Sequence, residues 1–344
     1  MVALTSAGDA QARRRPPSMA EVAALAGVSA QTVSRVANGR TNVEQATRER
    51  VLAAMGTLGY RPNRAARALR SGRSRSIGVL VYTLTSYGST RTVNGIALEA
   101  AKAGYSVTLI PLASPEPADV SAAFETLAEQ SIDGAAILLE VQRMTAAEIV
   151  LPTDLPVVVV DSGPPTRYPA IDNDQARGAR LATEHLLGLG HRSVWHIAGP
   201  QASHSAEVRR TTWEKTLRDA GAPVPEVLRG DWSPEAGYAI GSRLAEDPAV
   251  TAVFAANDQM ALGVLRALHD AGRDVPGDVS VVGFDDMPES ASFQPPLTTI
   301  HQHFDRIGVE CVSALLEEIE NGERQDHALV PVELVVRAST APPA

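Results

Sequence analysis

Five side chains in this sequence could together bind a small polar molecule. Asp161 directly follows the apolar run VVVV, Asn257 follows AVFAA, and Asp285 follows VSVVGF. Arg209 is expected to open a helix after another apolar strand, and Trp232 lies in the segment GDWSPEAG. Carboxylate, amide and guanidinium groups form paired hydrogen bonds with hydroxyls, and an indole ring covers the C–H face of a sugar. The pattern therefore predicts a sugar-binding cleft.

Each of these residues also has a purely structural explanation. Asn257 can cap a helix, Asp285 and Asp286 can cap a turn, and Trp232 can belong to a core. Asp161 and Asp285 could also flank a glycosidic bond as paired catalytic carboxylates, although a binding cleft explains them equally.

Other enzyme and metal sites are poorly supported. The sequence contains no phosphate-binding loop, no GxGxxG after its first strand and no GxSxG elbow. His185, His191 and His196 lack metal-ligand spacing, so we interpret them as surface or packing residues. The single cysteine, Cys311, excludes an internal disulfide and a cysteine-rich metal site. We expect no enzyme, no cofactor and no metal.

The elements that must position the five residues alternate between strand and helix patterns. This alternation predicts an α/β fold of two doubly wound parallel sheets, with ligands bound at the carboxyl ends of their strands. The expected strands are 77–82, 106–112, 134–139, 157–160, 193–198, 252–255, 279–284 and 298–300. The expected helices are 119–130, 174–189, 207–220, 234–245, 259–271 and 304–321.

A different pattern occupies the N-terminal part of the chain. Residues 19–39 predict two short helices with a turn at Gly27, and Ser18 with Glu21 has the spacing of a capping box. The second helix exposes Gln31 and Arg35, which suit a DNA major groove, since Arg can bind guanine and Gln adenine. A third helix over 44–58 closes a small core with Val51, Leu52, Met55 and Leu58.

Charge separates this small helical head from the rest of the chain. Residues 1–75 contain thirteen arginines, no lysine and four acidic residues, which gives a net charge of +9. The whole chain has 31 basic and 40 acidic residues, so residues 76–344 have 18 and 36, a net charge of −18. A solvated helical hairpin on a protein surface does not require such a concentration of positive charge, whereas a domain that binds phosphates does. We therefore interpret residues 18–62 as a helix-turn-helix DNA-binding domain.

The motifs resemble those of the lactose-repressor/galactose-repressor family of bacterial transcription regulators. The head AEVAALAGVSAQTVSRVANG is followed by GYRPNRAARAL, and ANDQMALG, VVGFDD and PPLTTI follow later in the expected order. The resemblance extends over nearly the whole chain from Ser18. It implies a helix-turn-helix head joined to an effector domain like that of periplasmic sugar-binding proteins.

The resemblance also assigns roles to individual residues. It implies DNA base contacts, DNA backbone contacts, minor-groove hinge contacts and effector contacts. The base contacts are Ala30, Gln31 and Arg35, and the backbone contacts are Ser29, Thr32, Ser34, Asn38 and Asn63. The minor-groove hinge contacts are Ala66, Leu69 and Arg70. The effector contacts are Asp161, Arg209, Trp232, Asn257, Asp285 and Phe304, together with Ser86 and Ser89 on the opposite wall of the cleft.

Two departures from a characterised family member concern specificity. Where that member has an apolar cleft lining, this chain has Ser86, Gly88, Ser89 and Thr92. A smaller and more polar wall indicates a polar aglycone, such as a second sugar ring. Ala30 replaces a tyrosine in the recognition helix, so the operator sequence need not match.

The predicted organisation has four parts. Residues 1–17 form a flexible tail, 18–62 the DNA-binding domain, 63–75 a hinge and 76–340 a sugar-binding and dimerisation domain. Within the last, an N-subdomain covers about 76–173 and 304–331, and a C-subdomain about 174–300 and 332–340. The hinge segment is about two turns long, too short for a stable isolated helix. We expect it to fold on DNA, with Leu69 in the minor groove; a plain basic linker is the alternative.

The sequence thus predicts a transcription regulator, most simply a repressor of sugar-utilisation genes that a glycoside or disaccharide releases from a palindromic operator. A corepressor-type regulator is one alternative, since the cleft state that the ligand prefers decides whether it weakens or tightens operator binding. A sugar-transport protein is another, disfavoured by the basic head and the lack of a signal peptide.

With no membrane-length apolar run, we expect a cytoplasmic protein. Because the chain ends in STAPPA soon after its last strand, we expect a homodimer.

Overall fold

The computed structural model describes residues 17–40, 42–61, 72–112, 114, 117–138, 155–161 and 168–344. The chain divides into two compact units between Ser74 and Arg75. The predicted hinge helix lies outside the described residues, and so do Asn63, Ala66, Leu69 and Arg70. Of the predicted N-terminal tail, only Pro17 is described.

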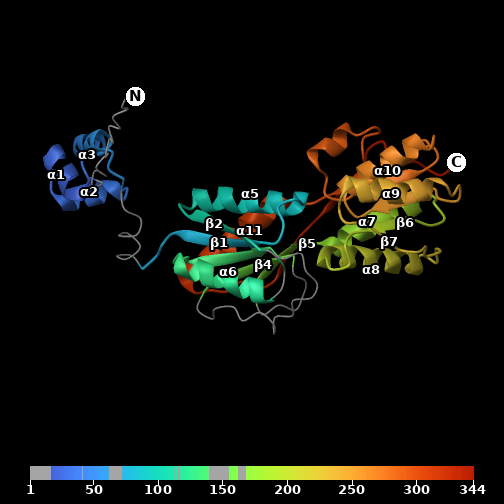
Figure 1. Ribbon diagram of the computed structural model, residues 1–344, viewed down its shortest axis with the longest axis horizontal. Helices are drawn as coiled ribbons and strands as arrows, with labels where there is room; N and C mark the ends of the chain where they lie inside the picture. Colours follow the sequence, from blue (N-terminus) through green and yellow to red (C-terminus); the bar gives the residue numbers. More distant parts are fainter. Residues whose placement is uncertain are drawn as a thin grey trace, which may run out of the picture. The chain divides into compact units, whose positions relative to one another are not determined.

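The first unit contains three helices, α1 (Met19–Ala26), α2 (Ala30–Ala37) and α3 (Gln45–Leu58). The predicted capping box is present, since Ser18 Oγ accepts a hydrogen bond from Glu21 N and the Glu21 carboxylate accepts one from Ser18 N. Gly27 ends α1 in the left-handed region, at φ 66°. The prediction for Leu52 was wrong: its side chain is 52% exposed, because Val51 and Met55 already face the core. The helix-turn-helix geometry is otherwise as expected (Figure 1).

The second unit contains two parallel sheets, as predicted. The larger has the strand order β11-β5-β4-β3-β1-β2 and the smaller β7-β6-β8-β9. The strands of the larger sheet are β1 (Ser76–Val81), β2 (Ser106–Pro111), β3 (Gly134–Leu138), β4 (Val157–Val160), β5 (Ala170–Asn173) and β11 (Ala328–Val330). Those of the smaller sheet are β6 (Trp195–Ala198), β7 (Leu228–Arg229), β8 (Ala252–Ala255) and β9 (Ser280–Val282).

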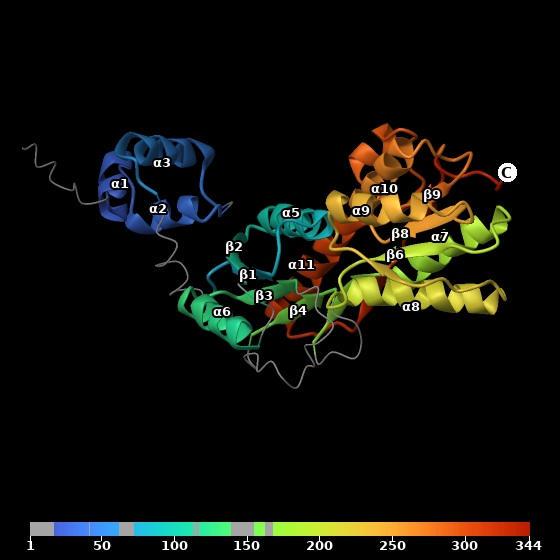
Figure 2. The same ribbon diagram turned by 45° about the vertical axis from the view of Figure 1, so that its right-hand side comes forward.

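Helices cover both faces of each sheet, which requires apolar residues on both sides of the strands. Along β1, Ile77 and Val79 face one cluster, whereas Leu80 faces the other. The covering helices appear in Figures 1 and 2. The larger sheet is covered on one face by α5 (Tyr87–Lys102) and α11 (Phe304–Asn321), and on the other by α6 (Pro117–Glu129). The smaller sheet is covered on one face by α9 (Pro234–Ala245) and α10 (Asp258–Asp270), and on the other by α7 (Gln175–Gly188) and α8 (His204–Asp219).

The two sheets are joined by three chain crossings, which follow β5, β10 (Thr299–His301) and β11. β10 pairs antiparallel with β12 (Glu333–Val335). We call the part around the larger sheet the N-subdomain and the part around the smaller sheet the C-subdomain. Because of the crossings, α11 belongs to the N-subdomain although its sequence follows the C-subdomain.

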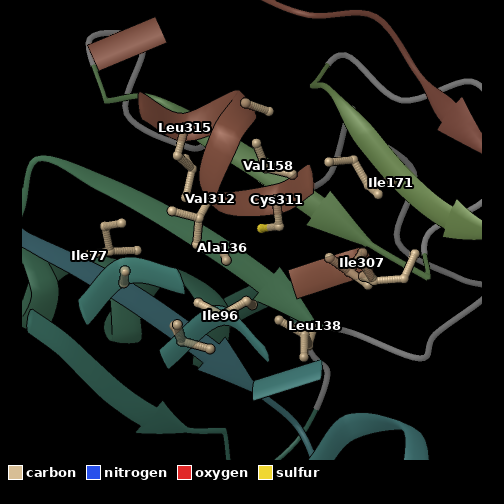
Figure 3. Close-up of a cluster of buried hydrophobic side chains, with 14 of the residues drawn as sticks. Ile77, Ile96, Ala136, Leu138, Val158, Ile171, Ile307, Cys311, Val312 and Leu315 are labelled. Carbon is tan, nitrogen blue, oxygen red and sulfur yellow. The ribbon is translucent and has the colours of Figure 1, made fainter. Parts of the chain in front are cut away.

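Close packing fixes α11 against the larger sheet. Cys311, Val312 and Leu315 project from α11 toward the strands, as Figure 3 shows. Gly308 meets Gly95 of α5 so closely that an added Cβ at position 308 would lie 2.5 Å from the α5 backbone. Burial raises the pKa of the Cys311 thiol to about 12, which makes it an inert core residue. The first residue of α11, Phe304, is thereby held at a defined place.

Four short strands were not predicted: β5, β7, β11 and β12. Each contains at most three consecutive apolar residues, too few for a clear strand signal. No helix among the described residues combines the length and the apolar character that crossing a membrane requires.

Candidate functional site

A cleft that is partly open to solvent lies in the second unit and is lined by both subdomains. All eight residues predicted to contact an effector line it. The described residues that line it are Ser86, Tyr87, Gly88, Ser89, Thr92, Leu138, Val160, Asp161, Asp172, Asn173, Gln175, Ser205, Arg209, Trp232, Asn257, Asp285, Gln302, Phe304 and Ile307.

Arg209 is the buried cation of the cleft, with a residue exposure of 4%. The sequence suggested that Arg209 opens its helix, and this was wrong. Helix α8 begins five residues earlier, at His204, with Ser203 as its N-cap. The guanidinium group lies 3.8 Å from the centre of the Phe284 ring and 5.6 Å from that of Trp232. It also donates a hydrogen bond to the carbonyl of Ala256. These contacts fix the orientation of the planar guanidinium group and its N–H donors.

This cation is one of four buried polar side chains that form a closed ring. Arg209 Nε donates to Gln175 Oε1 at 2.8 Å, and Gln175 Nε2 donates to Gln302 Oε1 at 2.9 Å. Gln302 Nε2 donates to Asp285 Oδ1 at 2.6 Å, and that oxygen lies 3.9 Å from Arg209 Nη2. We call Arg209, Gln175, Gln302 and Asp285 the polar ring. Because Gln175 and Gln302 flank crossing segments, the ring links the ligand cleft to the joints between the subdomains.

Asn257 serves both as a cap and as a cleft residue. Its Oδ1 accepts from Met260 N at 2.9 Å, which caps α10, and its Nδ2 donates to the Trp232 carbonyl at 3.1 Å. The structural explanation considered for this residue is therefore correct, and it does not compete with a position in the cleft.

Three cleft residues have left-handed backbone conformations that non-glycine residues seldom adopt. The φ angles are 57° at Asp161, 74° at Trp232 and 117° at Asp285. Such conformations cost about 1–3 kcal/mol each and persist where the surrounding structure imposes them. Their concentration in one cleft is typical of a functional site.

The N-subdomain supplies the opposite wall of the cleft. Ser86 caps α5 by accepting from Ser89 N at 3.2 Å, and its hydroxyl donates to Ser89 Oγ at 2.8 Å. The Tyr87 and Phe304 rings meet edge to face at 5.7 Å. A Cβ at Gly88 would lie 2.9 Å from the Phe304 ring, so glycine lets that ring pack against α5.

Sequence analysis missed several cleft residues, including Gln175, Gln302, Asp172, Asn173 and Ser205. Asp172 and Asn173 end β5, where only Ala170 and Ile171 precede them as apolar signals. The two glutamines follow no apolar strand directly, and only their spatial partners reveal their importance.

Two buried ionisable groups lie behind the cleft. Asp258 accepts hydrogen bonds from Ser290 Oγ at 2.6 Å, Met287 N at 2.9 Å and the Thr299 hydroxyl. Burial raises its pKa to about 6. Burial lowers the pKa of His196 to about 3, and its Nδ1 lies 2.9 Å from the Phe254 carbonyl. His196 is a packing residue, as expected. Within the described residues, no cluster of His, Cys, Asp and Glu is arranged to hold a metal ion.

The candidate DNA residues of the first unit gather along α2. Ala30, Gln31 and Arg35 are exposed, which base contacts would require. Ser29 Oγ accepts from Thr32 N at 3.1 Å and caps α2, and Asn38 Nδ2 donates to the Ser34 carbonyl at 2.6 Å. Helix α2 thus presents donors and acceptors on the face opposite Val33 and Val36.

Comparison with known proteins identifies the two units. Residues 18–63 match the model of "Bacterial regulatory proteins, lacI family", and residues 183–340 match "Periplasmic binding protein-like domain". The lactose operon repressor of Escherichia coli is 38% identical over 96% of this chain and 92% of its own length. The transcriptional repressor PurR of Haemophilus influenzae is 34% identical over 93% of this chain and 97% of its own.

Solved structures agree with this assignment. The Lac repressor dimer bound to operator and the anti-inducer ONPF has a TM-score of 0.86 at 36% identity, covering 95% of this chain and 100% of that one. The complex of the transcriptional regulator CelR with cellobiose has a TM-score of 0.70 at 32% identity, covering 94% and 99%. These relatives are regulators rather than enzymes. The chain belongs to the lacI family of bacterial regulatory proteins.

Proposed function

We propose that this protein represses sugar-utilisation genes and leaves a palindromic operator when a glycoside or disaccharide fills its cleft. The observation that carries the proposal is the polar ring beside Trp232, together with Phe304 on the opposite wall. Sugars are bound by such paired, buried polar groups and by aromatic faces. The proposal divides the chain into a DNA-binding domain (18–62), a hinge (63–75) and an effector domain (76–340).

The DNA-binding part of the proposal rests on α2 and on charge. Ala30, Gln31 and Arg35 would read base edges, while Ser29, Thr32, Ser34, Asn38 and Asn63 would contact the backbone. Ala66, Leu69 and Arg70 of the hinge would enter the minor groove. A regulator of chromosomal genes works in the cytoplasm, associated with the nucleoid while it is bound.

A dimer is needed because one head reads only half of a palindromic site. The related Lac repressor was solved as a dimer on its operator. On the described part of the N-subdomain, Leu84, Leu98 and Leu109 are exposed and offer apolar surface for such contacts.

The charge of the cleft restricts its ligand. Its lining includes three aspartates, Asp161, Asp172 and Asp285, and one arginine, Arg209. Among the described lining residues the formal charges sum to −2, which disfavours an anionic ligand such as a sugar phosphate. The cleft therefore favours a neutral sugar.

Coupling would act through the subdomain crossings. Closing the cleft on a sugar moves the N-subdomains of a dimer relative to each other, which separates the two hinges and withdraws Leu69 from the minor groove. The second candidate is a corepressor-type regulator, in which the ligand tightens operator binding instead of weakening it. The similarity to PurR repressors favours this alternative.

Operator binding measured by fluorescence anisotropy, with and without sugars, tests the proposal. We expect specific binding that a neutral sugar weakens; strengthening would support the corepressor alternative. Leu69→Ala should retain sugar affinity and lose operator affinity. Specific operator binding that no neutral sugar alters, combined with no sugar binding in calorimetry, would refute the sugar-responsive part.

A further inference from the structure

The turn that follows β9 places Asp285 in the cleft, and its backbone is unusual at two consecutive residues. Asp285 and Asp286 have φ angles of 117° and 52°, both in the left-handed region. Such conformations are unfavourable for residues other than glycine and persist only where surrounding contacts impose them. Asp285 lines the cleft, whereas Asp286 is not among the described lining residues. The contacts of Asp286 therefore indicate what holds this turn in place.

Two nitrogen donors from distant parts of the chain hold the Asp286 carboxylate. Arg337 Nη2 lies 2.6 Å from Asp286 Oδ1, and His301 Nδ1 lies 2.9 Å from Asp286 Oδ2. Because an ionised carboxylate can only accept hydrogen bonds, both nitrogens donate. The side chains of Asp286 and Arg337 are only 15% and 20% exposed, so water competes weakly for this pair. We call Asp286, Arg337 and His301 the clasp.

Arg337 is itself fixed by the segment that precedes β10. Its Nη1 donates to the Leu297 carbonyl at 2.8 Å, and its backbone N donates to Thr298 Oγ1 at 2.9 Å. His301 is the last residue of β10, one of the strands beside the subdomain crossings. The clasp thus joins the turn after β9 to β10 and to the segment that follows β12.

Buried Asp258 holds the two ends of the same turn. Its backbone N donates to the Phe284 carbonyl at 2.8 Å, and its carboxylate accepts from Met287 N at 2.9 Å. These two hydrogen bonds fix the chain on either side of residues 285 and 286. The clasp holds the side chain that lies between the two fixed ends.

We propose that the clasp positions Asp285 for the effector, so that Arg337 and Asp286 determine sugar affinity without touching the sugar. The clasp keeps the turn in its left-handed conformation, which brings Asp285 Oδ1 within 2.6 Å of Gln302 Nε2 in the polar ring. Without the clasp, the turn can relax and carry the carboxylate away from the ring. This inference rests on the proposed function, because it concerns sugar binding in the same cleft.

Two variants break the clasp, and a third preserves it. Arg337→Met removes a donor, and Asp286→Ala removes the acceptor. Asp286→Asn retains an oxygen that can accept from Arg337, and asparagine tolerates the left-handed region as aspartate does. Calorimetry on the full chain first screens glucose, galactose, cellobiose, lactose, maltose and melibiose. The sugar that binds wild-type protein most tightly is then the probe for every variant.

We expect Arg337→Met and Asp286→Ala each to bind this sugar about ten-fold or more weakly, because the displaced Asp285 loses a charged hydrogen bond to a hydroxyl. The double variant should be little weaker than either, since both changes remove the same clasp. Asp286→Asn should bind nearly as tightly as wild type. Operator affinity without sugar should be retained in all of them, which checks that they fold.

Arg210→Met is the matched control. Arg210 forms a comparably buried ion pair with Glu207, with side chains 19% and 20% exposed, and neither residue is among the described lining of the cleft. This variant should keep wild-type sugar affinity. A clasp with a purely structural role would lower stability toward urea in Arg337→Met and Asp286→Ala but leave the sugar affinity of the folded proteins unchanged.

Crystal structures of the sugar-free variants test the positioning step without any ligand. In Arg337→Met and Asp286→Ala, we expect residue 285 to leave its φ of 117° and the hydrogen bond from Gln302 to be lost. An unchanged turn in both variants would overturn the inference, whether or not a sugar binds.

The outcomes separate this inference from the proposed function. If no sugar of the panel binds wild-type protein, the sugar-responsive function fails, and the effect of the clasp on sugar affinity fails with it. If sugars bind wild type but both clasp-breaking variants keep its affinity, the positioning role alone is wrong.

Discussion

The two compact units differ in the burial of their polar side chains. In the head, the buried core is Val22, Ala23, Ala26, Val33, Val36, Val51, Ala54 and Met55, and no described polar side chain is buried. In the second unit, Arg209, Asp258 and Asp285 are all at least nine-tenths buried. No described polar side chain of the head is buried, whereas the second unit buries several, charged ones among them.

This difference reflects the size of what each unit is proposed to bind. A double helix is larger than the head, so contacts must project from a surface, and its phosphates add a long-range attraction to arginine. A neutral sugar provides no such attraction. Its hydroxyls must be bound by oriented groups in a site that excludes water, where each hydrogen bond is stronger.

The largest expected effect follows from breaking the polar ring. Asp285→Ala removes the carboxylate near buried Arg209 and the acceptor of Gln302. Losing one partner of a buried ion pair costs about 3–5 kcal/mol of stability. We also expect a loss of about 2 kcal/mol or more in sugar affinity, with operator binding unchanged. Calorimetry and operator anisotropy measure the two affinities.

Asp219→Ala is the matched control, because Asp219 forms an exposed pair with Lys215. Full sugar affinity in Asp285→Ala would contradict the role given to the polar ring.

An outward-facing contact should instead change specificity. Arg35→Ala should cost about 1–3 kcal/mol of operator affinity and relax discrimination at one base pair per half-site. Its stability should barely change, since Arg35 is exposed at the surface of α2. Competition with single-base operator variants measures this. Equal weakening on all sequences would identify Arg35 as a phosphate contact.

A third prediction uses pH to probe burial in the C-subdomain. The pKa of His196 is lowered to about 3 in the folded protein, from 6.5. Folding therefore favours the neutral ring, and the stability that it contributes is present above pH 6.5 and is lost as pH falls toward 3. Wild-type protein should lose about 1.4 kcal/mol relative to His196→Phe between pH 7.5 and 5.5.

Urea unfolding of both proteins at the two pH values measures this difference. Replacing the exposed His269 in the same way is the control. Parallel pH profiles for wild type and His196→Phe would show that His196 titrates normally.

The smallest expected effect concerns the local signals that stabilise the head. Ser18→Ala removes the cap of α1 and should cost about 1 kcal/mol, seen as faster hydrogen exchange of the α1 amides. Ser233→Ala removes the corresponding cap of α9, which also packs closely on α10 through Gly237 and Gly263. There the change should be confined to the first turn. Equal loosening of both helices would contradict the comparison.

The sequence predicted those parts of the molecule that local signals determine. Helices 234–245 and 304–321 have the predicted bounds, because apolar periodicity and end signals coincide there. Asp161, Asn257 and Asp285 were recognised because long apolar runs precede them.

The missed residues depend on contacts between distant parts of the chain. Gln175 pairs with residues 34 and 127 positions away, and nothing next to it in the sequence reveals this. Asn173 follows only two apolar residues of β5, a strand that exists because β4 and β11 pair with it on either side. Such positions become visible only once the fold brings their partners together.

The polar ring also has a direction. A glutamine side chain can turn over and exchange its oxygen and nitrogen, so two isolated glutamines offer four arrangements. At one end of the pair, however, arginine can only donate, and at the other end aspartate can only accept. Both amides must therefore point the same way around, and turning either one breaks two hydrogen bonds. The protein thus offers its ligand a single pattern of donors and acceptors, fixed before the ligand arrives.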